Sequence, residues 1–142
     1  MIYSSQSEEA GGIMDKLYEY MRRQLNFAPT ELRRYMYERI NWDSRMLGLV
    51  GPRGVGKTTL FLQRILDKHS LDDTLYITAD HLYFANHTLL DTAEAFYKYG
   101  GKHLFIDEVH NYDGWSRELK ALYDSFPGLQ VLFTGSSILD IE

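Results

Sequence analysis

The sequence predicts an α/β fold in which a parallel sheet carries helices on both of its faces. From residue 46 onward, short apolar segments of strand length alternate along the chain with segments of helical periodicity. This alternation is typical of parallel sheets, because parallel strands are joined by crossover connections that usually contain a helix. A second observation is a glycine-rich segment between the first such strand and the helix that follows it.

The glycine-rich segment fits the phosphate-loop pattern G-x-x-x-x-G-K-[ST] at every fixed position. Its glycines allow a sharp turn whose backbone N–H groups point at phosphate oxygens, and the next helix adds its positive end. We expect Lys57 to reach the β- and γ-phosphates and Thr58 to hold Mg²⁺. The competing interpretation is a chance match, which the flanking strand and helix argue against. The predicted nucleotide-binding residues are Gly51, Pro52, Arg53, Gly54, Val55, Gly56, Lys57, Thr58 and Thr59.

Four strands and three helices are expected in the region that carries this loop. The strands are predicted over residues 46–50, 74–78, 103–106 and 129–133. The helices are predicted from the phosphate loop to about His69, over 88–99 and over 115–126. In such sheets the ligand lies at the carboxyl ends of the strands, where Gly51, Asp80, Asp107, Glu108 and Thr134 are expected to converge.

The chain divides into three expected parts. Residues 1–12 are polar and acidic and predict a flexible tail. Residues 13–45 predict two helices, the first amphipathic and the second capped by Thr30. Residues 46–142 predict the nucleotide-binding core.

The third strand of the core ends on two adjacent carboxylates, Asp107 and Glu108. In a sheet that also carries a phosphate loop, the first acid can hold magnesium through water opposite Thr58. The second is suited to orient or deprotonate an attacking water. The alternative interpretation makes Glu108 a solvated loop carboxylate.

The fourth strand is followed by hydroxyl side chains in the sequence Thr-Gly-Ser-Ser at 134–137. A hydroxyl from Thr134 or Ser136 could contact the γ-phosphate or the attacking water, and we include Thr134 among the catalytic candidates with Lys57 and Glu108. The alternative is that Ser136 or Ser137 caps the next segment.

With these segments in place, the chain resembles the AAA+-like P-loop ATPase cores of bacteria and archaea. The resemblance runs from about Arg33 to the end of the chain. It rests on the phosphate loop at 51–59, Leu-Phe-Ile-Asp-Glu-Val-His at 104–110, Trp-Ser-Arg-Glu-Leu-Lys at 115–120 and Phe-Thr-Gly-Ser-Ser at 133–137. The last two blocks are the more distinctive.

The resemblance implies a P-loop NTPase fold of the additional-strand type, with the fourth strand between the first and the third. It also implies ATP as the nucleotide, with Lys57 at the phosphates and with Thr58 and Asp107 at Mg²⁺. Proteins of this kind continue into a fifth strand, a helical lid and a C-terminal region. The sequence therefore looks like a truncated core, whose expected partners are a missing C-terminal domain or another protein, or a second copy.

Composition sets limits on the remaining classes of function. The net charge is −5, and all of the acidic excess lies after residue 48, which gives no indication of nucleic-acid binding. The sequence has no cysteine, no secretory signal and no apolar run long enough for a membrane helix, so a cytoplasmic protein without a membrane partner is expected.

We expect Mg-dependent ATP hydrolysis that drives a conformational change in an attached domain. The main alternative is a nucleotide-dependent switch with little turnover. A helicase is disfavoured, because helicases with a motif like Asp-Glu-Val-His usually have far more sequence between the phosphate loop and the acidic motif than the 50 positions from Lys57 to Asp107. A P-loop kinase is another possibility, but the sequence shows no recognisable phosphate-acceptor site.

Overall fold

The computed structural model describes residues 5–28, 34–52 and 56–136. Its elements in chain order are α1 (Ser5–Asn26), α2 (Arg34–Arg39), β1 (Met46–Gly51), α3 (Lys57–Lys68), β2 (Thr74–Thr78), the 3₁₀ turn η1 (Leu82–Ala85), α4 (Leu89–Lys98), β3 (His103–Asp107), the 3₁₀ turn η2 (Val109–Asn111), α5 (Trp115–Ser125) and β4 (Gln130–Ser136).

The four strands form one parallel sheet in the order β1-β4-β3-β2. The last strand in sequence therefore pairs with the strand that precedes the phosphate loop, and the β3 strand lies on its other side. This order confirms the α/β fold of the additional-strand P-loop type, with β4 inserted between β1 and β3. Because all four strands are parallel, their carboxyl ends lie at one edge of the sheet.

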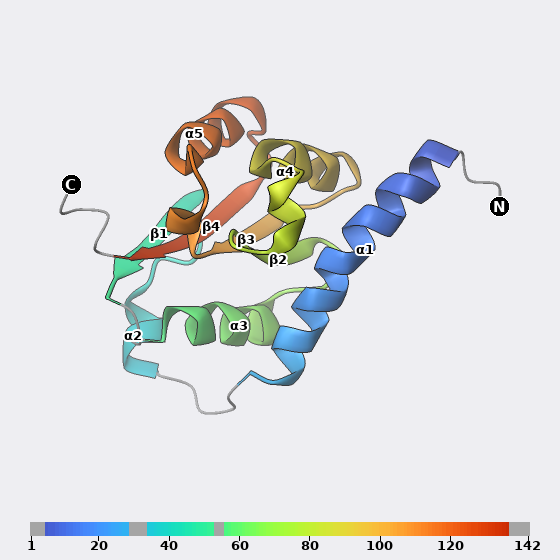
Figure 1. Ribbon diagram of the computed structural model, residues 1–142. Helices are drawn as coiled ribbons and strands as arrows, with labels where there is room; N and C mark the ends of the chain where they lie inside the picture. Colours follow the sequence, from blue (N-terminus) through green and yellow to red (C-terminus); the bar gives the residue numbers. More distant parts are fainter. Residues whose placement is uncertain (1–4, 29–33, 53–55, 137–142) are drawn as a thin grey trace.

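Helices cover both faces of the sheet (Figure 1). The α3 helix lies against one face, and α4 and α5 lie against the other. Alternate side chains along each strand point to opposite faces, so each strand contributes to two apolar cores. On the α3 side, Tyr76, Phe105 and Leu132 pack against the helix. On the opposite side, Leu75, Leu104 and Val131 pack against α4 and α5.

The long helix α1 covers the β2 edge of the sheet (Figure 1). Met14 and Leu17 join the core beneath α4, whereas Met21 and Leu25 join the core beneath α3. The backbone N–H of Tyr76 on this edge donates to the sulfur of Met21 at 3.3 Å. An exposed strand edge is a liability for pairing with other chains, and α1 removes it at β2.

The β1 strand forms the opposite edge of the described sheet. The α2 helix lies beside it, and a groove between them is lined by Tyr35, Met36 and Arg39 from α2 and by Leu49 and Val50 from β1.

Several element boundaries differ from the sequence-based expectations. The first helix begins at Ser5 and runs through Gly11 and Gly12, where a flexible tail was expected over residues 1–12. Good helix formers before the glycines, such as Glu9 and Ala10, offset the weak helix propensity of glycine. The Thr30 cap of the second helix lies outside the described residues.

The core elements follow the predictions more closely. The β2 strand has the predicted limits, and β1 and β3 are each one residue longer than predicted. The β4 strand continues to Ser136, so Thr134 lies inside it and not beyond its end. The two 3₁₀ turns were not predicted, because three or four residues are too few to show a helical period.

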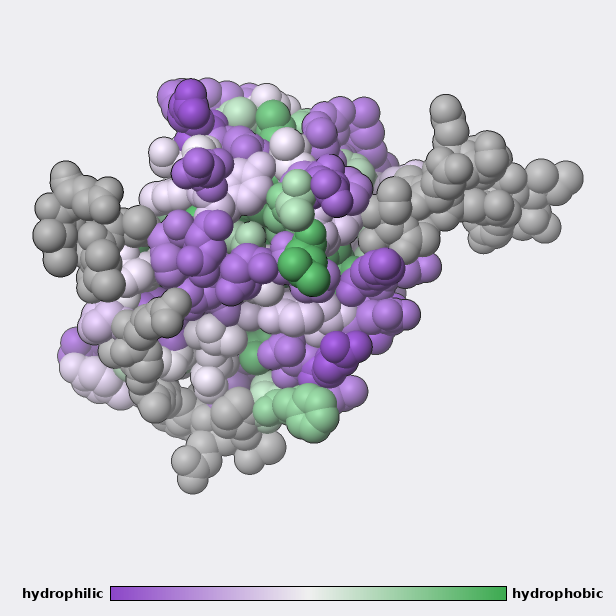
Figure 2. Space-filling view, in the orientation of Figure 1, coloured by the Kyte–Doolittle hydropathy of each residue, from purple (hydrophilic) through white to green (hydrophobic). Residues whose placement is uncertain are grey.

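The face seen in Figure 2 is mainly hydrophilic, with small apolar patches separated by polar side chains. Exposed large apolar residues such as Phe27 and Leu82 are scattered over different elements. Among the described residues, no helix combines the length and the apolar composition that crossing a membrane requires.

The end of α3 makes the stability of the fold sensitive to pH. The pKa of His69 is lowered from 6.5 to about 4, mainly because the ring is buried, with smaller contributions from the neighbouring His103 and Arg64 that outweigh the opposite effect of Asp73. In the unfolded chain His69 therefore binds a proton near pH 6.5, whereas in the folded chain it binds one only near pH 4. We expect the free energy of unfolding to fall as the pH drops through this window.

Urea denaturation at about pH 7 and about pH 5 checks this expectation, with His69→Gln as the comparison. The loss of stability between the two conditions should be smaller in the variant, because it has no imidazole to protonate. An equal loss in both proteins would contradict the assignment to His69.

Candidate nucleotide-binding site

A row of polar side chains crosses the sheet at its carboxyl edge, on the face covered by α3. Tyr76, Phe105 and Leu132 form an apolar row on three neighbouring strands. Two residues further along each strand, on the same face, come Thr78, Asp107 and Thr134. The sheet register thus brings residues that are distant in sequence to the same place as the beginning of α3.

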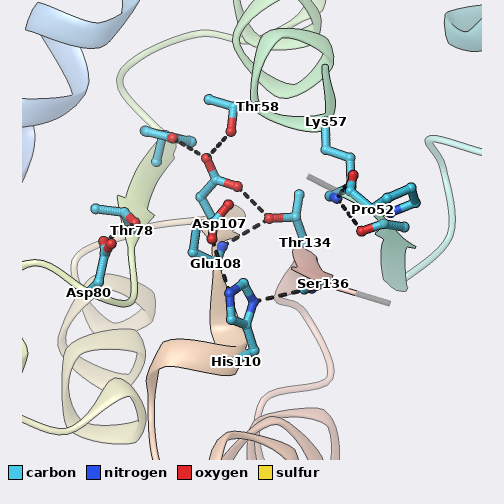
Figure 3. Close-up of polar contacts among 12 residues, drawn as sticks. Pro52, Lys57, Thr58, Thr78, Asp80, Asp107, Glu108, His110, Thr134 and Ser136 are labelled. Atoms are coloured by element: carbon cyan, nitrogen blue, oxygen red, sulfur yellow. Dashed lines mark hydrogen bonds and ion pairs between the residues drawn. The ribbon is translucent and has the colours of Figure 1, made fainter. Parts of the chain in front are cut away.

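Asp107 lies at the centre of this row and is 3% exposed. Its Oδ2 accepts hydrogen bonds from the hydroxyl of Thr58 at 2.5 Å and from the hydroxyl of Tyr76 at 2.6 Å. Its Oδ1 accepts from the hydroxyl of Thr134 (Figure 3). A carboxylate has about four acceptor positions, so three hydroxyls satisfy most of them and fix its orientation. These are charge-assisted bonds, which compensate for the cost of burying the charge.

The hydroxyl of Tyr76 remains a donor over the whole physiological pH range. Burial raises the pKa of Tyr76 well above its usual value of 10, and the negative charge of Asp107 raises it further. The hydroxyl accordingly keeps its proton for the carboxylate. The residue as a whole is 1% exposed.

Thr134 is placed differently from our expectation. Its hydroxyl donates to Asp107 and accepts from the backbone N–H of Glu108 at 2.9 Å. The side chain is fully buried inside β4. A hydroxyl with both of these bonds has little capacity left for a phosphate or a water. In this geometry the Thr134 hydroxyl contacts both acidic residues.

Glu108 follows the strand in a left-handed conformation, with φ 59° and ψ 45°. Among the described residues it is the one residue other than glycine with a positive φ. Such a conformation is costly for a residue with a side chain and is concentrated at functional sites. It turns the chain out of β3 into η2.

The Glu108 carboxylate contacts His110, a residue that the sequence analysis did not assign to the site. Its Oε2 lies 3.2 Å from Nε2 of His110 (Figure 3). The other ring nitrogen, Nδ1, accepts from the backbone N–H of Ser136 at 3.2 Å. The neutral ring therefore carries its proton on Nε2, facing the carboxylate. His110 links the second acidic residue to the end of β4.

The part of the phosphate loop that the structure describes leads from β1 into α3. Gly51 ends the strand beside Ser136 of β4. Gly56 has φ 89° and immediately precedes the helix, a conformation that only glycine adopts without strain. Lys57 begins the helix, and its ammonium donates to the carbonyl oxygens of Gly51 at 2.6 Å and Pro52 at 3.0 Å. Arg53, Gly54 and Val55 lie outside the described residues.

These residues fit the nucleotide and the metal that the phosphate loop implies. The N-terminal turn of α3, the Lys57 ammonium and the Thr58 hydroxyl lie together at the end of β1. Phosphate favours such a place, because helix N-termini and ammonium groups both attract anions. Magnesium prefers oxygen ligands and retains several waters, and the Thr58 hydroxyl and Asp107 carboxylate are a donor set of that kind.

The sequence analysis named the acidic pair and the phosphate loop but not Tyr76 or His110, which contact the acidic pair in the structure. Tyr76 could have been found from strand parity, since it lies on the same face as Thr78, and Thr78 pairs with Asp107. Asp80 was expected at this edge. It accepts a hydrogen bond from Thr78 at 2.5 Å and is exposed to solvent.

The fold and the site together define the class of protein. A parallel sheet with β4 between β1 and β3, a phosphate loop after β1 and a buried aspartate bonded to the threonine of that loop characterise a P-loop nucleotide-binding protein of the ATPase type. A model of the AAA domain family matches residues 43–142, and the chain belongs to this family.

Two further proteins are similar to parts of this chain. An uncharacterized protein of Methanocaldococcus jannaschii is 36% identical over 93 residues, which are 63% of this chain and 20% of that protein. The chain thus spans about a fifth of the length of this curated relative. The structure of C. elegans PCH-2 is similar with a TM-score of 0.42 and 20% sequence identity. The match covers 95% of this chain and 37% of the PCH-2 chain. The family assignment rests on the domain match.

The structure predicts a high cost for removing the Thr134 hydroxyl. In Thr134→Val, Asp107 loses a charge-assisted bond and the N–H of Glu108 loses its acceptor. We expect the free energy of unfolding to fall by about 2–4 kcal/mol, measured by urea denaturation.

Thr92→Val is a matched control for this experiment. Thr92 is also a buried threonine, but its hydroxyl contacts neutral groups, the carbonyl of Thr88 at 2.8 Å and the hydroxyl of Tyr83 at 3.3 Å. This variant should lose about 1 kcal/mol. A loss in Thr134→Val no larger than in the control would show that Thr134 does not support the acidic pair.

Proposed function

We propose that the chain binds ATP together with Mg²⁺ and hydrolyses the nucleotide. The observation that carries this proposal is the 2.5 Å hydrogen bond between Thr58 of the phosphate loop and the buried Asp107. It joins the two side chains that would hold the metal, one from each of two segments far apart in the sequence. Membership of the AAA domain family supports the same function.

Each polar side chain at the site has a task in this proposal. Lys57 would neutralise phosphate charge at the N-terminus of α3, together with the backbone N–H groups of the loop. Thr58 and Asp107 would hold the metal, which supplies further positive charge to the phosphates when it is bound. Thr58 can donate its proton to Asp107 and still offer an oxygen lone pair.

Glu108 would act on the attacking water. Glu108 directly follows Asp107 at the end of β3, and 27% of its side chain is exposed. A carboxylate in such a position can orient a water and take its proton. The left-handed backbone conformation of Glu108 supports a functional task, because such costly conformations are concentrated at functional sites.

A second candidate function is a nucleotide-dependent switch with little turnover. One observation favours it, namely the contact between Glu108 and His110 at 3.2 Å. A carboxylate held by a neighbouring imidazole has fewer acceptor positions left for a water. In this alternative the nucleotide would act through its binding alone, and Glu108 would be a structural residue.

We further propose that the nucleotide state is passed to an attached domain or to a protein partner. In the relative from M. jannaschii the matched region is about a fifth of the protein, so that protein has further segments on which such a core could act. A second copy of the chain is another possible recipient. The compartment that we propose is the cytoplasm.

Calorimetric titration with Mg-ATP tests binding directly. Lys57→Ala should weaken the affinity about tenfold to a hundredfold, as expected for a lost charge-assisted contact. Lys68→Ala removes the same charge from the exposed end of α3 and should leave the affinity unchanged. Equal affinities of Lys57→Ala and the unmodified chain would contradict nucleotide binding at this loop.

Turnover separates the two candidate functions. Glu108→Gln should lower the rate of ATP hydrolysis about a hundredfold or more while the affinity for Mg-ATP is retained. Glu94→Gln, which changes a carboxylate on the surface of α4, serves as the control. Tight binding with no measurable hydrolysis by the unmodified chain, and no effect of Glu108→Gln, would favour the switch.

A further inference from the structure

We propose that Tyr76 is a positioning residue for the metal site, and that its hydroxyl holds the Asp107 carboxylate in the orientation that Mg²⁺ requires. This inference rests on the proposed function, because it concerns the dependence of nucleotide binding on the metal. Tyr76 lies in β2, whereas the phosphate loop joins β1 to α3 and the acidic pair lies at the end of β3.

The hydrogen bond from Tyr76 has the geometry of a strong charge-assisted contact. The phenol oxygen lies 2.6 Å from Oδ2 of Asp107, within the range for a hydroxyl that donates to a carboxylate. The register of β2 and β3 explains how the side chain reaches this place. Tyr76 is opposite Phe105, one step before the pair of Thr78 and Asp107 on the same face. A side chain the length of tyrosine spans that step.

Tyr76 and Thr134 hold the carboxylate from opposite sides. Tyr76 donates from β2 to Oδ2, and Thr134 donates from β4 to Oδ1, while β3 carries Asp107 between them. Thr58 also donates to Oδ2, but its oxygen is a ligand candidate for the metal. Tyr76 is therefore the donor that fixes Oδ2 without itself taking part in metal binding. A fixed carboxylate avoids the entropic cost of ordering when the metal binds.

The surroundings of the Tyr76 ring hold the donor still. Tyr20 of α1 stacks on it, with a distance of 6.2 Å between ring centroids and an angle of 6° between the planes. The next residue in α1, Met21, accepts the backbone N–H of Tyr76 through its sulfur. Both contacts come from the N-terminal helix, which precedes the region that matches the AAA domain. The α1 helix thereby contributes to the order of the metal site.

The experiment compares the affinity for ATP with and without Mg²⁺ in the unmodified chain and in Tyr76→Phe. Calorimetry is carried out in excess Mg²⁺ and in the presence of a chelator, and the Mg²⁺ concentration for half-maximal effect is determined. In Tyr76→Phe this concentration should rise about tenfold, while the affinity for metal-free ATP stays the same. A purely structural role would lower both affinities together.

Tyr20→Phe is the matched control, since it removes a hydroxyl from the neighbouring ring and retains the stack. It should leave the Mg²⁺ dependence unchanged. Thermal unfolding of each variant establishes that the titrations are made on folded protein. Tyr20→Ala, which removes the supporting ring but leaves the Tyr76 hydroxyl, should raise the required Mg²⁺ concentration by a smaller factor.

Each outcome decides a different question. An unchanged or lower Mg²⁺ requirement in Tyr76→Phe would overturn the positioning role, even if the unmodified chain binds Mg-ATP as proposed. An equal loss of affinity with and without the metal would overturn it as well and would make Tyr76 a structural residue. Absence of Mg-ATP binding by the unmodified chain would contradict the proposed function itself, and the inference with it.

Discussion

The burial of one carboxylate, that of Asp107, is the constraint on which the rest of the site depends. A charge that is almost fully removed from water must be compensated by hydrogen bonds, or it destabilises the fold by several kcal/mol. Three hydroxyl groups meet this need, and they come from the phosphate loop, from β2 and from β4. The nucleotide site and the sheet are therefore parts of one hydrogen-bonded unit.

This unit explains why the strand order matters for function. Only a β4 strand that lies beside β3 can bring Thr134 to both Asp107 and the backbone of Glu108. Only a β2 strand on the other side of β3 can bring Tyr76 to the same carboxylate. The α1 helix closes the β2 edge and stacks on Tyr76, so a segment outside the family match also takes part.

Sequence reasoning recovered what local patterns encode. The alternation of strands and helices predicted the sheet. The sequence motifs of the phosphate loop and of Asp107-Glu108 predicted residues at its carboxyl edge. It could not recover what depends on register. Whether Thr134 faces a phosphate or the acidic pair is set by its position inside β4, and the contact of His110 with Glu108 is set by the left-handed turn after β3. The start of α1 at Ser5 was missed because the polar and acidic composition of residues 1–12 was taken to indicate a flexible tail.

A crystal structure of the chain with Mg²⁺ and a non-hydrolysable ATP analogue tests the central claim most directly. The account predicts phosphates at Lys57, the metal beside Thr58 and Asp107, and an Asp107 carboxylate still bonded to Tyr76 and Thr134. The side chain of Glu108 should point toward the terminal phosphate. A nucleotide bound elsewhere, or an Asp107 carboxylate turned away from Tyr76 and Thr134 to reach the metal, would contradict the account.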